Sequence, residues 1–201
     1  MTRRYIEGAT LGRRWTLAVA AAFGATVVLG RLIAASAANE PTLSDAVAVL
    51  EKERSAAEQY AVFLASVGRK DVDTYLRGIQ LYADAKADFD GLIAALRLDL
   101  IEGHNPAQSP KFAAALQVAA EKRVAFTNFV SDKVVGKAEG ARPGLIDVVK
   151  VVPDLVKAIT DAGLAIWEAF RKGSKERQDA ILSEIDHLRW RSFADLAKAG
   201  D

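Results

Sequence analysis

Apolar side chains recur at alternating spacings of four and three residues along most of the chain after residue 41. This spacing is typical of amphipathic helices that pack one apolar edge, here called the seam, against another helix. It predicts helices over residues 42–67 and 71–102, and a third from residue 109 that fades before Gly136. The seam positions are Leu43, Val47, Leu50, Arg54, Ala57, Ala61 and Leu64 in the first helix, Val72, Tyr75, Ile79, Tyr82, Lys86, Phe89, Ile93, Leu96 and Leu100 in the second, and Phe112, Leu116, Ala119, Arg123, Phe126 and Val130 in the third.

Capping residues stand at the predicted helix starts. Thr42 precedes Asp45 by three residues, as in a capping box, and Asp71 can cap the second helix. Ser109 and Pro110 suit the N-cap and first position of the third helix. Only a few residues, around Arg69, separate the first two helices, so we expect an antiparallel hairpin.

The last third of the chain contains two more helical patterns. One begins near Leu145, where Pro153 predicts either a kink or a short helix over 145–151 with a new start at Pro153. The other is capped by Ser174, and its inner face is Ile181, Leu182, Ile185, Leu188 and Phe193. A glycine-rich stretch at about 136–144 reads as a mobile loop inside one domain. Residues 38–201 are therefore expected to form an all-α, antiparallel bundle of four to five helices.

The N-terminus has the layout of an export signal. Arg13 and Arg14 precede an uncharged run over 15–30, and small residues follow at 34–38. Ala35-Ser36-Ala37 fits a cleavage site, which makes 1–37 a signal peptide. Residues 15–38 are also long enough to span a bilayer if Arg31 snorkels, which makes the segment a signal anchor.

The charges of the N-terminal segment predict its orientation. Residues 1–14 contain four arginines and one glutamate, so we expect them on the cytoplasmic side and the bundle outside. The bundle is then periplasmic or extracytoplasmic, and it is tethered to the inner membrane if the segment is not cleaved.

Charge and cysteine content exclude several function classes. Five of the 27 basic and one of the 26 acidic residues precede residue 38, which leaves 22 basic and 25 acidic residues in the bundle. A net charge of −3 argues against nucleic-acid binding. The chain has no cysteine, and this excludes disulfides, a thiol nucleophile and a thiolate metal site.

A single cation interrupts each of the three long seams: Arg54, Lys86 and Arg123. In an antiparallel arrangement these cations lie at about the same height. Three unpaired charges could not be buried there, so one hypothesis is an anion-binding or acidic-ligand site between the helices. The alternative is that their stems line the seam while their heads reach Glu58, Asp90 or Glu121 at its rim.

The run Arg189-Trp190-Arg191 also supports two interpretations. With Ile185 and Leu188 facing inward, Arg189 and Trp190 turn towards the rim of the bundle. An arginine-flanked tryptophan is typical of interface hot spots, so these residues are candidates for partner contact. The same residue types can form a cation–π clasp that holds the last helix to the body.

No set of residues selects an enzyme, a metal or a cofactor. Glu184 and His187 form a single E-x-x-H, whereas a ferritin-like di-metal bundle needs two, and Glu102 is wrongly spaced relative to His104. We therefore expect an exported, non-enzymatic bundle protein of the bacterial cell envelope that contacts another envelope protein or itself. The alternative is a periplasmic ligand-binding or sensory bundle that uses the three seam cations.

Overall fold

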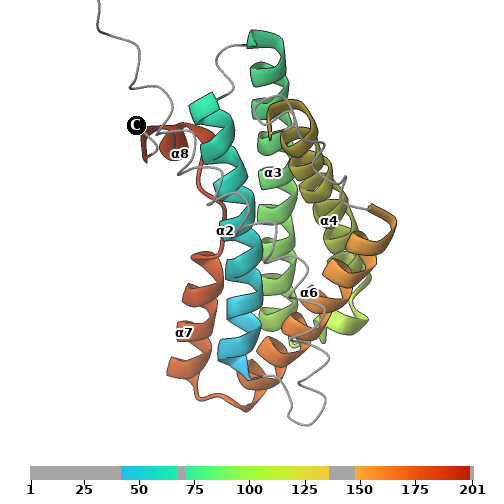
Figure 1. Ribbon diagram of the computed structural model, residues 1–201. Coiled ribbons are helices and arrows are strands. Elements are labelled where there is room, and N and C mark those ends of the chain that lie inside the picture. Colours follow the sequence, from blue (N-terminus) through green and yellow to red (C-terminus); the bar gives the residue numbers. More distant parts are fainter. Residues whose placement is uncertain (1–41, 68–70, 136–147, 200–201) are drawn as a thin grey trace, which may run out of the picture. The chain divides into compact units, whose positions relative to one another are not determined.

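A computed structural model describes residues 42–67, 71–135 and 148–199 (Figure 1). All secondary structure in these ranges is helical, which confirms the predicted all-α class. Six α-helices are present there, where four to five were expected. The predicted export or anchor segment, residues 1–37, and the predicted loop at 136–144 lie outside the described residues.

Three long helices run up and down beside one another: α2 (Leu43–Val67), α3 (Val72–Glu102) and α4 (Pro110–Val130). A short 3₁₀ helix, η2 (Pro106–Gln108), precedes α4, and a π-helical turn, η3 (Ser131–Val135), follows it. The predicted caps are confirmed. Asp71 accepts a hydrogen bond from Thr74 N at 3.1 Å, and Ser109 accepts one from Phe112 N at 3.3 Å. Thr42 and Asp45 bond reciprocally.

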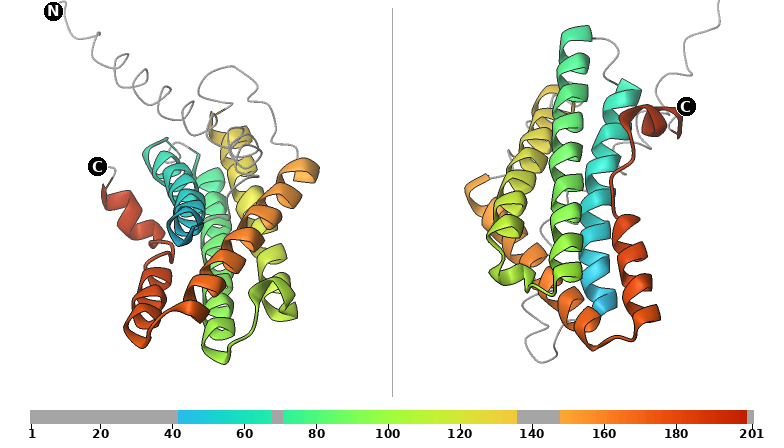
Figure 2. Two further views of the ribbon diagram at one scale, coloured as in Figure 1. Left: turned by 90° about the horizontal axis from the view of Figure 1, so that it is seen from below. Right: turned by 180° about the vertical axis from the view of Figure 1, so that it is seen from behind.

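Helix α6 (Val148–Lys172) crosses the end of the bundle obliquely and packs on α2 and α4 (Figure 2). It runs through Pro153 without a break, so of the two predicted alternatives the new start at this residue is wrong, and the kink stays a prediction. Pro153 lies in the second turn, where its missing N–H removes a single helix hydrogen bond to residue 149.

The predicted last helix is in fact two helices, α7 (Lys175–Asp186) and α8 (Phe193–Ala199). The break has a local cause. Ser192 Oγ accepts a hydrogen bond from Asp195 N at 3.2 Å and donates one to Asp195 Oδ2 at 2.6 Å. This is a capping pair that starts a new helix at Phe193. Residues 187–192, here called the strap, connect the two helices.

The seams form the core. Tyr82, Phe112 and Phe126 are among the largest fully buried side chains, and Tyr82 meets Phe126 edge to face at 5.3 Å. Leu43, Tyr75 and Ile79 are only partly buried, and Val72, at the first position of α3, is 63% exposed. None of the described helices is apolar enough over a sufficient length to cross a membrane.

Ionisation of Tyr60 is expected to destabilise this core at alkaline pH. Burial raises the pKa of Tyr60 to about 12, although Arg123 opposes the shift. A phenol with a raised folded-state pKa stabilises the protein fully below its unfolded pKa of about 10, and the contribution is lost as the pH rises towards 12. We expect the ionisation of Tyr60 alone to lower the free energy of unfolding by about 1 kcal/mol at about pH 11. Urea unfolding followed by circular dichroism measures this, and Tyr60→Phe should reduce the fall.

Candidate functional site

The three seam cations each have a different partner. Lys86 pairs with Asp90 at the rim, as one of the two interpretations expected. Arg54 Nη1 donates to the backbone oxygen of His187 at 2.5 Å, at the C-terminal end of α7. A cation there is favourable because a helix C-terminus is partly negative.

Arg123 is the cation that enters the core. Its side chain is 5% exposed, and its Nη2 lies 2.8 Å from Oε2 of Glu53, which is itself 4% exposed. The expected partner at this position, Glu121, instead accepts a hydrogen bond from Gln117. Arg123 is therefore buried as half of an ion pair, and its charge is already compensated by the protein.

The strap is held to α2 and α3 by side chains that bond its backbone. Glu58 accepts hydrogen bonds from the N, Nε and Nη2 of Arg191 at 2.9, 3.0 and 2.8 Å. Tyr82 donates to the Arg191 backbone oxygen at 2.8 Å, and Asp90 accepts from Trp190 N at 3.2 Å. These contacts supply the partners that a non-helical backbone segment needs when it lies against a core.

Trp190 lies inside the bundle, so its predicted place at the rim is wrong. It is 3% exposed and stacks between Tyr82 and Phe89, with ring centroids 5.6 and 5.1 Å away. The strap does not follow the helical path from which the rim position was deduced. Arg189 and Arg191 do reach the surface, where Arg189 meets Asp186 and Arg191 meets Glu58. Their role in partner contact stays a prediction.

From Leu76 to Ile101, the side of α3 that faces away from the core carries no charge. At about 100° per residue, the positions opposite the buried seam recur at spacings of four and three. All of them are exposed, and Leu76 and Ile101 are 57% and 55% exposed. Figure 2 shows in its right panel that no other described helix covers this side. The outer face of α3, as it is called below, consists of Leu76, Gln80, Ala83, Ala87, Gly91, Ala94, Leu98 and Ile101.

Such a face is unusual because the exposed side of a surface helix normally carries its charged residues. In α3 the charges lie along the two borders instead. Arg77, Asp84 and Asp88 follow one border, and Lys86, Asp90 and Arg97 follow the other. The pattern is typical of a helix face that packs against a further apolar helix.

Gly91, in the middle of this face, makes no close packing contact with the described residues that would require a glycine. A Cβ atom added there would meet nothing within 4 Å. Gly78 differs, since its Cβ would lie 2.5 Å from Leu64 Cδ2. An exposed glycine inside a helix destabilises it by about 1 kcal/mol relative to alanine. Glycine permits the close approach of another backbone, and none of the described elements makes that approach at Gly91.

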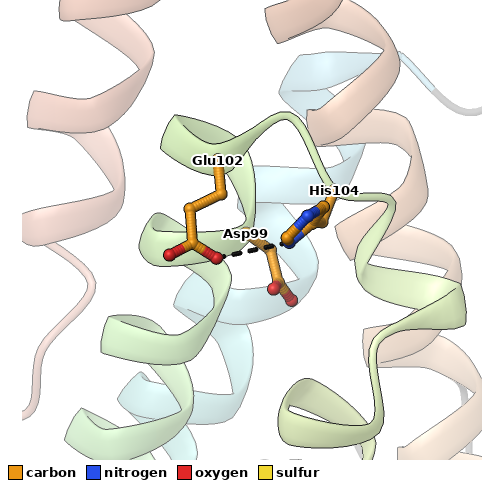
Figure 3. A group of neighbouring side chains, drawn as sticks. All are labelled: Asp99, Glu102 and His104. Carbon is orange, nitrogen blue, oxygen red and sulfur yellow. Dashed lines mark ion pairs between the residues drawn. The ribbon is translucent and has the colours of Figure 1, made fainter.

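A second polar cluster lies where α3 ends. Asp99, Glu102 and His104 bring one ligand atom each to within 4.8 Å of one another (Figure 3). Sequence spacing alone had excluded Glu102 and His104 as a pair, yet His104 Nδ1 is 3.3 Å from Glu102 Oε2. The signal that was missed is Gly103, whose left-handed conformation (φ 74°) turns the chain back over the helix end.

Comparisons with protein-family models, with curated proteins and with solved structures found no match to this chain.

Proposed function

We propose that this chain is an exported, non-enzymatic helical-bundle protein of the bacterial cell envelope, and that it acts through protein–protein contacts made by the outer face of α3. The observation behind the proposal is the exposed, uncharged face with Gly91 at its centre. The export pattern at residues 13–38 supports the location.

A second copy of the chain fits this face. The large side chains stand at its two ends, Leu76 at one and Leu98 with Ile101 at the other, and the residues between them are mostly small. If two α3 helices run antiparallel and cross near residue 88, Leu76 of one copy lies near Leu98 and Ile101 of the other. Lys86 then lies opposite Asp90 of the second copy, so the border charges are complementary there.

Native mass spectrometry on the chain purified from its own envelope in mild detergent tests this proposal. The expected species is a dimer, and the chain mass reports whether residues 1–37 have been removed. Ala94→Glu places a charge on the outer face and should give a monomer. Ala180→Glu, a matched change of an exposed alanine on α7, should leave the dimer intact. A wild-type monomer, or a complex with a different protein only, would contradict the second-copy arrangement.

Gly91→Ala separates the effect of this position on the stability of the monomer from its effect on dimer formation. We expect the variant to stabilise the monomer by up to about 1 kcal/mol, because alanine is the better helix former. The same methyl group stands between two close backbones in the dimer, so the dissociation constant should rise by roughly tenfold or more. Sedimentation velocity and urea unfolding measure the two effects. If the dissociation constant is unchanged, Gly91 is not a point of close contact.

The anion-binding alternative rests on Arg54, Lys86 and Arg123. Within the described residues each of these cations already bonds a carboxylate or a backbone oxygen. No observation specifically favours a ligand between the helices at the height of these three cations.

A further inference from the structure

The end of α3 is built as a rigid turn that gathers three ligand-type side chains. The backbone N–H of Gly103 bonds the carbonyl oxygen of Leu100 at 3.2 Å, and that of His104 bonds the carbonyl oxygen of Asp99 at 2.8 Å. Both bonds tie the turn to the last helical turn, which fixes His104 above Asp99. Figure 3 shows the side chains of Asp99, Glu102 and His104 gathered at this turn.

One carboxylate oxygen of Asp99, Oδ2, has no hydrogen-bond partner among the described residues. The residue is 2% exposed. A buried carboxylate oxygen without a hydrogen-bond partner favours a nearby cation. The need is greater here, because the C-terminus of a helix is itself partly negative. The last turn of α3 contains no basic residue and adds a second carboxylate, Glu102.

The donor set and its spacing fit a transition-metal cation. Imidazole nitrogen with carboxylate oxygen suits Zn²⁺ and similar divalent ions, whereas Ca²⁺ and Mg²⁺ prefer oxygen ligands alone. Bonds of about 2.0–2.1 Å in a tetrahedral Zn²⁺ site separate neighbouring ligand atoms by about 3.4 Å. The 3.3 Å between His104 Nδ1 and Glu102 Oε2 matches this edge. These two side chains are 64% and 42% exposed, so they can rotate to close the remaining distance to Asp99.

We propose that Asp99, Glu102 and His104 bind a divalent transition-metal cation of the Zn²⁺ type, with water or a further group completing the coordination. The cation neutralises the buried carboxylate and links the end of α3 to the turn that leads into η2. The site is independent of the outer face of α3, so either proposal can fail without the other.

Zinc titration of the full chain, free of any histidine tag and stripped with a chelator, tests the site by isothermal titration calorimetry. We expect one Zn²⁺ per chain. His104→Ala should weaken binding by at least about tenfold. His187→Ala, which changes the other histidine of the chain, should leave it unchanged. Absence of Zn²⁺ binding by the wild type, or equal binding by His104→Ala, would overturn the proposal.

Thermal unfolding adds a second readout, independent of the calorimetric titration. Without metal, Asp99→Asn should melt at a higher temperature than the wild type, because it removes a buried carboxyl group whose Oδ2 has no hydrogen-bond partner in the described part of the chain. Added Zn²⁺ should raise the melting temperature of the wild type and not that of Asp99→Asn. If Zn²⁺ stabilises both chains equally, Asp99 is not a ligand. If Asp99→Asn melts lower without metal, the carboxylate already has a partner in the protein.

Discussion

Replacing Arg123 with methionine is expected to destabilise the bundle by about 3–5 kcal/mol. Methionine fills a similar volume, so the loss comes from Glu53, which would remain 4% exposed with no cation beside it. Removal of one member of a buried ion pair leaves a charge that neither water nor protein compensates. Urea unfolding of the variant, followed by circular dichroism, measures the change in the free energy of unfolding.

Two controls separate the effect of leaving Glu53 buried without its cation from the effect of losing the packing of the Arg123 side chain. The double variant Glu53→Met with Arg123→Met removes both charges and should recover most of the loss, as apolar replacements of buried pairs often do. Lys157→Met breaks an exposed pair with Asp161, whose side chains are 68% and 47% exposed, and should change stability by less than about 1 kcal/mol. If the double variant is as unstable as the single one, Arg123 acts through its packing and not through its charge.

The helices of the bundle were predictable because apolar spacing reports directly which side of a helix is buried. The positions of α2, α3 and α4 follow from their seams, and their starts follow from Asp71, Ser109 and the pair Thr42–Asp45. These are local signals, fixed by residues within one helical turn of each other. The apolar seams and the capping residues are therefore enough to predict these three helices.

The break between α7 and α8 was missed because two signals conflict there. Ile181, Ile185 and Leu188 keep helical spacing and are all buried, which favours one continuous helix. The pair Ser192–Asp195 starts a new helix. The sequence predicts this start only if the capping signal at Ser192 is given more weight than the helical spacing of the apolar residues around it. Trp190 was misplaced for the same reason, since its rim position assumed an unbroken helix.

The candidate sites show a different limit. Following one seam identified Arg123 as a cation that interrupts it, but neither its burial nor its partner, Glu53 of α2, could be deduced in this way. Which carboxylate pairs with Arg123 depends on which helices pack together. The spacing of residues within one helix does not show this. The outer face of α3 could have been found from the sequence, because the uncharged positions from Leu76 to Ile101 are visible as soon as the face opposite the seam is read.

Trp190→Ala is expected to destabilise the protein by about 3–5 kcal/mol, the range for removal of a large aromatic side chain from a core. The ring is 3% exposed and fills the space between Tyr82 and Phe89. The backbone N–H that donates to Asp90 is kept in the variant, so the change isolates the ring from the hydrogen bonds of the strap. Urea unfolding gives the stability, and limited proteolysis shows whether the strap opens.

Trp167 supplies the matched control for this substitution. It lies on α6, is only partly buried, and stacks under the guanidinium of Arg171 at 4.9 Å. Its replacement by alanine should cost clearly less, because its ring already contacts solvent and the cation–π contact is worth about 0.5–1 kcal/mol at an exposed site. Cleavage within residues 187–192 should rise in Trp190→Ala and stay at the wild-type level in Trp167→Ala. Equal losses of stability and unchanged cleavage would mean that the strap is held by Glu58 and Asp90 alone, without the aromatic stack.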